Sequence, residues 1–288
     1  MTKARKQHLD WDMILKAAKG IVESYATGVT LRQLFYRLVS KRLIPNAQVA
    51  YKTLSAKTAE ARRNNAFPRL IDRGRQIKVV ETYRDAADAV AQTGRYFRLD
   101  RTIGQRVSIY LGVEKAGIVN QLWAWFADLG IPILALGGYS SQTFCDDVSA
   151  DMEARDRPAV LIYAGDHDPS GEDIDRDFTA RTNSFEAVRR IALNAEQVDE
   201  YSLPPLPGKE TDARAAAFEA RHGRLVQVEL DALDPDILRK LYQHAIDEFW
   251  EDGAYTEMIA KEDIERRRIK TVKAARADGG GELGSETP

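Results

Sequence analysis

One stretch near the middle of the chain, Leu161-Ile-Tyr-Ala-Gly-Asp-His-Asp-Pro-Ser-Gly171, limits the folds that the sequence can adopt. The apolar run from Val160 to Tyr163 predicts a buried strand, and two carboxylates, Asp166 and Asp168, follow it in a loop. Open α/β sheets bind their ligands beyond the carboxyl ends of the strands. Two carboxylates this close repel each other unless a hard cation such as Mg²⁺ binds between them. The alternative is an Asp-rich turn that only caps the helix expected from Glu172.

Two more apolar runs precede this strand. Residues 107–113 predict a strand that ends at Glu114, and residues 131–136 predict another, with helical spacing over 118–128 between them. Strands that alternate with helices indicate an α/β fold with a parallel sheet, in which Glu114 would share one edge with the two aspartates. Further along, we expect a strand over 189–193 and helices over 173–182, 211–222, 235–250 and 254–277.

Charge is divided unevenly along the 288 residues. Residues 1–106 carry 22 Lys and Arg against 9 Asp and Glu, a net charge of +13, whereas residues 107–288 carry 20 against 35, a net charge of −15. A basic half suggests that the first part of the chain binds nucleic acid. The acidic half indicates either metal ligands or solvated helix surface.

The basic half shows helical periodicity in three segments, 10–26, 31–39 and 49–64, and residues 67–75 suggest the short β-element of a wing. Three helices and a wing form a variant of the helix-turn-helix, which places its third helix against a DNA groove. A plain three-helix bundle with a basic surface is the alternative. The candidate DNA contacts on the third helix are Lys52, Lys57, Arg62 and Arg63.

Tyr36 lies on the second of these helices, one turn after Arg32. A tyrosine on an amphipathic helix is commonly a core residue. A phenol, with a pKa near 10, needs a neighbouring cation or base to attack phosphorus at neutral pH. Arg32 would lie on the same face of the helix and could supply that charge.

Three motifs in this order resemble a known family. Glu114 after one strand, Gly138-Tyr-Ser-Ser141 after the next and Gly165-Asp-His-Asp-Pro-Ser-Gly171 after the third resemble a Toprim domain. Their form is most similar to the A subunit of DNA topoisomerase VI and to the related meiotic double-strand-break protein. The segment Thr30-x-Arg32-x-Leu-Phe-Tyr36 resembles the part of that family that holds the DNA-cleaving tyrosine.

The resemblance covers roughly residues 10–235, including a Glu-x-Asp-Ala-Leu stretch within 226–233. It implies a winged-helix domain over residues 1–100 and a Toprim-like domain with C-terminal helices over 101–275. The composition of residues 276–288 predicts a disordered tail. The length of the chain matches the shortened "Mini-A" relatives of phages and plasmids.

The activity that the resemblance implies is Mg²⁺-dependent cleavage of double-stranded DNA by tyrosine transesterification. Tyr36 would be the nucleophile, with Arg32 beside the scissile phosphate. Glu114, Asp166 and Asp168 would hold Mg²⁺, and Glu114 could also protonate the leaving 3′-hydroxyl. Lys115 would be a further DNA contact. The family implies a homodimer in which one protomer's tyrosine works with the other's metal, and an ATPase B-type subunit that this sequence does not identify.

Two other functions stay open at this point. A Toprim nuclease would use water as its nucleophile and Tyr36 only for packing, and a DNA-binding regulator would cleave nothing. Lys209 is a candidate phosphate contact, although a solvated lysine is the simpler interpretation. The single cysteine, Cys145, excludes an intrachain disulfide and predicts a buried structural thiol in a reducing, intracellular compartment. The resemblance to phage and plasmid relatives implies the cytoplasm or nucleoid of a bacterial host cell. No apolar run is long enough to predict a membrane span.

Overall fold

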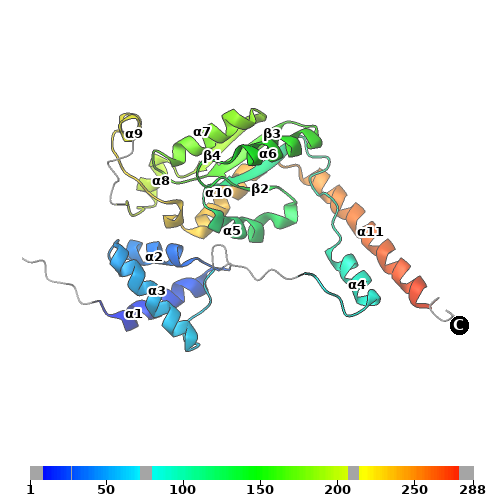
Figure 1. Cartoon of the computed structure of the whole chain (residues 1–288), viewed down its shortest axis with the longest axis horizontal. Coiled ribbons are helices and arrows are strands. Elements are labelled where there is room, and N and C mark those ends of the chain that lie inside the picture. The colour runs from blue at the N-terminus through cyan, green and yellow to red at the C-terminus, as the bar shows by residue number, and fades with distance from the viewer. Residues whose placement is uncertain (1–8, 27, 72–79, 207–213, 279–288) are drawn as a thin grey trace, which may run out of the picture. The chain divides into compact units, whose positions relative to one another are not determined.

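A computed structural model describes residues 9–26, 28–71, 80–206 and 214–278 (Figure 1). The chain divides into two compact units. The first comprises residues 1–75, 107–127 and 131–249, and the second comprises residues 76–106, 128–130 and 250–288. The predicted domain boundary near residue 100 falls inside the second unit, and the assignment of domains on either side of it stays a prediction. None of the described helices has both the length and the apolar character needed to cross a membrane.

A four-stranded parallel sheet forms the centre of the first unit. Its strands are β1 (Ser108–Val113), β2 (Ile133–Ala135), β3 (Ala159–Ala164) and β4 (Phe185–Ala192), in the spatial order β2-β1-β3-β4. All of the paired strands are parallel, which confirms the prediction of an α/β fold. Every residue of β1 and β3 is buried, as expected for central parallel strands that are covered on both faces.

Helices cover both faces of this sheet (Figure 1). On one face, Tyr110 and Leu161 pack in a buried cluster with α6 and α7, which also includes Phe178. On the other face, the Tyr242 hydroxyl of α10 donates a 2.6 Å hydrogen bond to the Gly112 carbonyl of β1, and its ring contacts α5. These helices are α5 (Ala116–Phe126), α6 (Gln142–Arg155), α7 (Gly171–Thr182) and α10 (Pro235–Asp247), with α8 (Ala195–Glu200) and α9 (Ala215–His222) between α7 and α10 in the chain.

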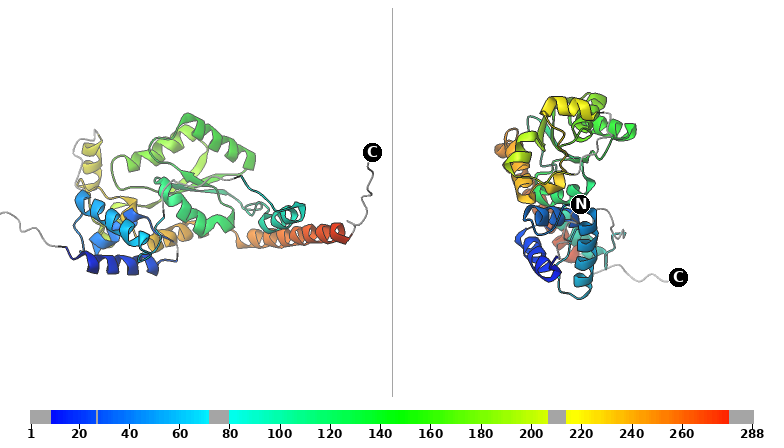
Figure 2. Two further views of the ribbon diagram at one scale, coloured as in Figure 1. Left: turned by 60° about the horizontal axis from the view of Figure 1, so that its bottom comes forward. Right: turned by 90° about the vertical axis from the view of Figure 1, so that its left-hand side faces the viewer.

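The three expected N-terminal helices are present as α1 (Trp11–Ser24), α2 (Leu31–Ser40) and α3 (Gln48–Arg63). They form the blue bundle seen from two further directions in Figure 2. The predicted wing is limited, within the described residues, to an isolated parallel bridge between Ile71 and Thr30. Residues 72–75 of that prediction lie outside the described residues.

The second unit contains α4 (Ala86–Tyr96) and α11 (Asp252–Asp278), which pack against each other. The buried guanidinium of Arg101 contacts both oxygens of Glu262 on α11, at 2.7 and 3.0 Å, and the Leu99 amide donates to the same carboxylate. Paired contacts of this kind satisfy both buried charges. Helix α11 continues to Asp278 and so extends into the tail expected over 276–288, of which residues 279–288 lie outside the described residues.

Two short 3₁₀ turns complete the described elements, η1 (Ala127–Leu129) and η2 (Leu230–Ala232). The stretch 226–233 forms an isolated antiparallel bridge between Val228 and His167 before η2. Its backbone lies against the loop that follows β3.

The start of α2 is stabilised by a pair of reciprocal hydrogen bonds. The Thr30 hydroxyl accepts a hydrogen bond from the Gln33 amide, and the Gln33 side chain accepts one from the Thr30 amide, so both groups cap the helix. Removing such a cap costs about 1 kcal/mol. We expect Thr30→Ala to lower the free energy of unfolding by that amount in chemical denaturation. Thr53→Ala, inside α3, is the control, and an equal effect of both changes would contradict the capping role.

Candidate functional site at the carboxyl edge of the sheet

The three predicted acidic residues gather at one edge of the sheet. Glu114 directly follows β1, and its amide donates to the Ala164 carbonyl at the end of β3. The Glu114 side chain turns toward the loop after β3, where its Oε2 accepts a 2.7 Å hydrogen bond from the Asp166 amide. The first carboxylate therefore fixes the backbone of the loop that carries the other two.

Close backbone approach shapes this loop. A Cβ atom on Gly171 would overlap the Asp166 carbonyl oxygen and lie 3.2 Å from Oε2 of Glu114, so only glycine fits there. The Asp168 carboxylate accepts a 2.6 Å hydrogen bond from the Gly171 amide, at the first turn of α7. The alternative interpretation of this turn was that its aspartates only cap the helix. Capping of α7 is therefore part of the role of Asp168 in this structure.

Arg190, on β4, holds the same loop from the other side. Its guanidinium donates to the backbone carbonyls of Asp166 and Gly171 at 2.7 and 3.0 Å, and it lies 3.1 Å from a carboxylate oxygen of Asp175. Sequence analysis did not identify this residue. An arginine inside an expected strand was the available signal, because a cation on a half-buried strand needs acceptors close by.

Lys115 places a positive charge against Asp166. Its Nζ lies 2.6 Å from one oxygen of Asp166, whose other oxygen accepts a hydrogen bond from the Leu230 amide. Burial and the nearby Glu114 charge outweigh this attraction and raise the pKa of Asp166 to about 7. Burial also raises the pKa of Glu114. The pKa of Lys115 rises as well, because the surrounding carboxylates outweigh the effect of its own burial.

The chemistry of these donors fits a hard divalent cation. Glu114, Asp166 and Asp168 offer only oxygen ligands. Burial, and then the charge of Glu114, raise the pKa of Asp166, and a cation would offset both effects. In this structure, the ammonium of Lys115 supplies that positive charge. The three carboxylates do not form a group whose ligand atoms all lie within 4.8 Å of one another. Because Lys115 Nζ lies 2.6 Å from Asp166, Mg²⁺ binding would require Lys115 to move away and the carboxylates to draw closer together.

Tyr36 and Arg32, both on α2, face the acidic loop across a cavity of about 570 Å³. The Tyr36 side chain is only 3% exposed, and Arg32 forms an ion pair with Glu229, which directly precedes η2. Burial and the Glu229 charge raise the pKa of Tyr36 to about 12, whereas Arg32 acts to lower it. The cavity brings together, within one chain, Arg32, Tyr36, Tyr51, Asp166, Asp168 and Glu229.

Glu229 is the second residue whose place sequence analysis did not foresee. It lies in the stretch 226–233, which had drawn attention only by its resemblance. Its Oε1 pairs with Arg32 and its Oε2 lies 4.0 Å from Lys115 Nζ. Among the described residues, that second oxygen has no hydrogen-bond partner. Glu229 thus links the cation beside Tyr36 to the cation beside Asp166.

The predicted DNA contacts differ in accessibility. Lys52 and Arg63 are exposed on α3, whereas Lys57 and Arg62 are half-buried. The Lys115 side chain is 20% exposed and paired with Asp166, so the structure gives it a place within the acidic site. Lys209 lies outside the described residues.

The Gly138-Tyr-Ser-Ser141 motif connects helices rather than joining the acidic edge. The Ser141 hydroxyl accepts a hydrogen bond from the Phe144 amide and caps α6, and the exposed Tyr139 hydroxyl donates to Asp173 on α7 at 2.6 Å. Arg181 of α7 donates to the Ser140 carbonyl. The motif therefore fixes the start of α6 against α7.

No family model matches this sequence, and no curated protein is similar to it. The fold and the geometry of the site define a broad class of protein. The chain is a mixed α/β protein with a parallel sheet and an acidic cluster at the carboxyl edge of that sheet.

The raised pKa of Asp166 predicts how stability depends on pH. Its ordinary value of 3.8 applies to the unfolded chain, so between about pH 4 and 7 the folded, metal-free protein binds more protons. We therefore expect stability to fall as pH rises through this window, as thermal unfolding at a series of pH values would measure. Asp166→Asn should flatten this dependence and Asp147→Asn, exposed on α6, should not. An unchanged slope in Asp166→Asn would contradict the assignment.

Proposed function

We propose that the chain cleaves DNA strands by transesterification, with Tyr36 as the nucleophile. The observation that carries the proposal is the single cavity lined by Tyr36, Arg32 and both aspartates of the acidic loop. A phenol, a guanidinium and a carboxylate pair are the groups needed to attack a phosphodiester, to stabilise charge on phosphorus and to bind a divalent cation. The Tyr36 segment and the Asp166–Asp168 loop, which both resemble parts of the topoisomerase VI A family, line this cavity.

The finer fold assignment belongs to the same proposal. A parallel sheet with acidic residues after β1 and β3 supports a Toprim domain, and α1–α3 with the bridge at Ile71 support a winged helix. We assign the chain to this two-domain architecture. A homodimer with two such cavities would cut both strands of a DNA duplex. Each cavity would combine the tyrosine and the carboxylates of one chain, in place of the pairing between protomers that the resemblance implies. An ATPase partner of the B-subunit type is also part of what the resemblance implies.

The reaction follows from the groups present. The Tyr36 oxygen would attack the phosphorus and form a 5′-phosphotyrosyl ester, while the bond to the 3′-oxygen breaks. The phenol proton would pass to the carboxylate of Glu229, whose charge acts on Tyr36. Arg32 would stabilise the charge on the phosphoryl oxygens after exchanging Glu229 for the phosphate. Glu114 would pass a proton to the leaving 3′-oxygen. Mg²⁺ held by Glu114, Asp166 and Asp168 would supply charge neutralisation at the phosphate and leaving oxygen.

The raised pKa of Tyr36 sets a requirement on this chemistry. At a pKa of about 12 the phenol is protonated at neutral pH, so the attack depends on stabilising the phenolate as it forms. Among the described residues, Arg32 is the cation beside the Tyr36 hydroxyl. Loss of one such stabilising donor typically lowers the rate by about 10²–10³-fold. Glu229, which pairs with Arg32, supplies a carboxylate near the phenol.

Replacing the nucleophile tests the proposal. Supercoiled plasmid is incubated with the full chain and Mg²⁺, then analysed on gels with and without protease. We expect wild-type protein to give DNA that enters the gel only after proteolysis, and Tyr36→Phe to give neither cleavage nor an adduct. Tyr96→Phe, at an exposed position in the second unit, is the matched control.

Two outcomes would favour the other functions. Cleavage by Tyr36→Phe without an adduct would support a nuclease that uses water. Unchanged DNA binding without cleavage by wild-type protein, with Mg²⁺ as with EDTA, would support a DNA-binding protein that is not an enzyme. Asp168→Ala should abolish cleavage by either metal-dependent mechanism.

The basic surface of α3 gives an independent prediction about binding. Lys52 and Arg63 are its exposed predicted contacts, so we expect Lys52→Ala/Arg63→Ala to weaken binding to duplex DNA. The slope of log affinity against log salt should shrink by about 0.9 for each phosphate that the variant no longer neutralises. Lys240→Ala, exposed on α10, is the control. Equal affinity and slope in the double variant would place the DNA on another surface.

A further inference from the structure

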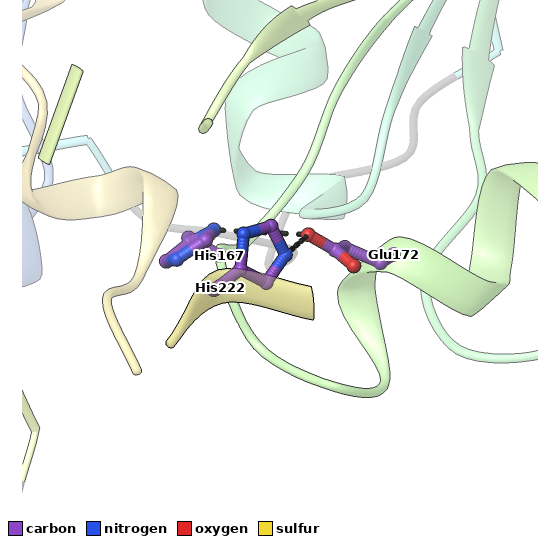
Figure 3. A group of neighbouring side chains, drawn as sticks. All are labelled: His167, Glu172 and His222. Carbon is purple, nitrogen blue, oxygen red and sulfur yellow. Dashed lines mark hydrogen bonds and ion pairs between the residues drawn. The ribbon is translucent and has the colours of Figure 1, made fainter. Parts of the chain in front are cut away.

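We propose that His167, Glu172 and His222 bind a divalent transition-metal ion of the zinc type, in a site separate from the predicted magnesium site. Figure 3 shows the two imidazole rings beside the carboxylate, with the marked interactions ending on one oxygen of Glu172. One ligand atom from each residue lies within 4.8 Å of the ligand atoms of the other two. Among the His, Cys, Asp and Glu residues that the structure describes, this is the group of three whose ligand atoms lie so close together.

Three separate elements supply these ligands. His167 lies between Asp166 and Asp168, in a segment bridged to Val228 by two backbone hydrogen bonds of 2.9 Å. Successive side chains of an extended segment point in opposite directions. The aspartates accordingly line the cavity below α2, whereas the His167 ring packs against α9, 4.9 Å from the ring of His222. Glu172 is in the first turn of α7, and His222 ends α9.

The distances suit an ion after small adjustments. Nε2 of His222 lies 2.6 Å from Oε1 of Glu172, and Nδ1 of His167 lies 3.9 Å from the same oxygen. Zinc bonds of about 2.0 Å in a tetrahedral site place neighbouring ligand atoms about 3.3 Å apart. The distance from His222 to Glu172 would lengthen and the distance from His167 to Glu172 would shorten, each by less than about 1 Å in this geometry. The hydrogen bond between Glu172 and His222 holds the carboxylate near this position without an ion.

An independent observation points to a ligand. His167 is 2% exposed, and its Nδ1 has no hydrogen-bond partner among the residues that the structure describes. Such a buried polar atom is costly to leave unsatisfied. The ring of Phe218 packs against both imidazoles, which accounts for the position of the His167 ring but gives its nitrogen no partner. A metal ion between the three ligands would satisfy it.

The neighbouring charges leave one oxygen of Glu172 available. Nη1 of Arg221 binds the other oxygen, Oε2, at 2.7 Å and so orients the carboxylate with Oε1 toward the histidines. Two histidines and one glutamate with an open fourth position form a ligand set found in zinc sites. Imidazole nitrogens also select zinc-type ions over Mg²⁺, which prefers oxygen. A bound ion would tie the acidic loop to α7 and α9 from the side opposite the cavity.

Cobalt provides a direct probe of this site. The full chain is stripped of metal with a chelator and then titrated with Co²⁺ in the presence of excess Mg²⁺. We expect one equivalent to bind with the intense visible absorption of a four-coordinate ion, and Zn²⁺ to displace it. His222→Ala and Glu172→Gln should each lower the affinity by more than the roughly 10–100-fold that changes in residues around a metal's ligands cost. His244→Ala, exposed on α10, should bind like wild type.

Clear outcomes would overturn the proposal. Absence of four-coordinate absorption would do so, as would wild-type Co²⁺ affinity in Glu172→Gln. Because Glu172→Gln keeps the shape of the side chain, it tests the site even if His222→Ala fails to fold. Absorption reports binding without any DNA. Tyr36→Phe should therefore bind Co²⁺ normally, so failure of this inference and failure of the proposed cleavage can be told apart.

Discussion

The buried contact between Asp166 and Lys115 governs the carboxyl edge of the sheet. A carboxylate at this depth is unfavourable by itself, and its 2.6 Å contact with the ammonium, together with the hydrogen bond from the Leu230 amide, keeps it in place. The same carboxylate connects β1, β3 and η2, so the positions of the surrounding groups depend on it. The excess of negative charge that remains beside Glu114 is the physical basis for expecting a divalent cation there.

Much of the fold could be predicted because its signals are local. Apolar runs followed by Gly, Asp or Glu located β1, β2 and β3, and helical periodicity located the N-terminal helices. The strand expected over 189–193 covers only the second half of β4, which begins at Phe185. The second unit could not be predicted, because the packing of α4 against α11 joins segments that are far apart in sequence and that share no motif. The bridge at Val228 depends on a partner in the acidic loop, which no local pattern specifies.

The site divides in the same way. Glu114, Asp166 and Asp168 were found because each follows a strand, whereas Arg190 and the pairing of Glu229 with Arg32 arise only when distant segments meet. The group around His167 shows the limit most clearly, since its third member, His222, lies at the end of a short helix without a recognisable motif. Chain order can predict which residues share a sheet edge, but not which loops close over it.

The ion pair between Arg32 and Glu229 has a consequence for how the cavity would receive an anion. The guanidinium is already neutralised by a carboxylate, so an incoming phosphate would substitute for that carboxylate rather than meet a bare charge. In such an exchange, one oxyanion replaces another beside the guanidinium. Glu229 already lies 4.0 Å from the Lys115 ammonium, which could serve as its counterion once the phosphate is bound. The resting protein thereby keeps its buried charges balanced while the arginine stays available to a polyanion.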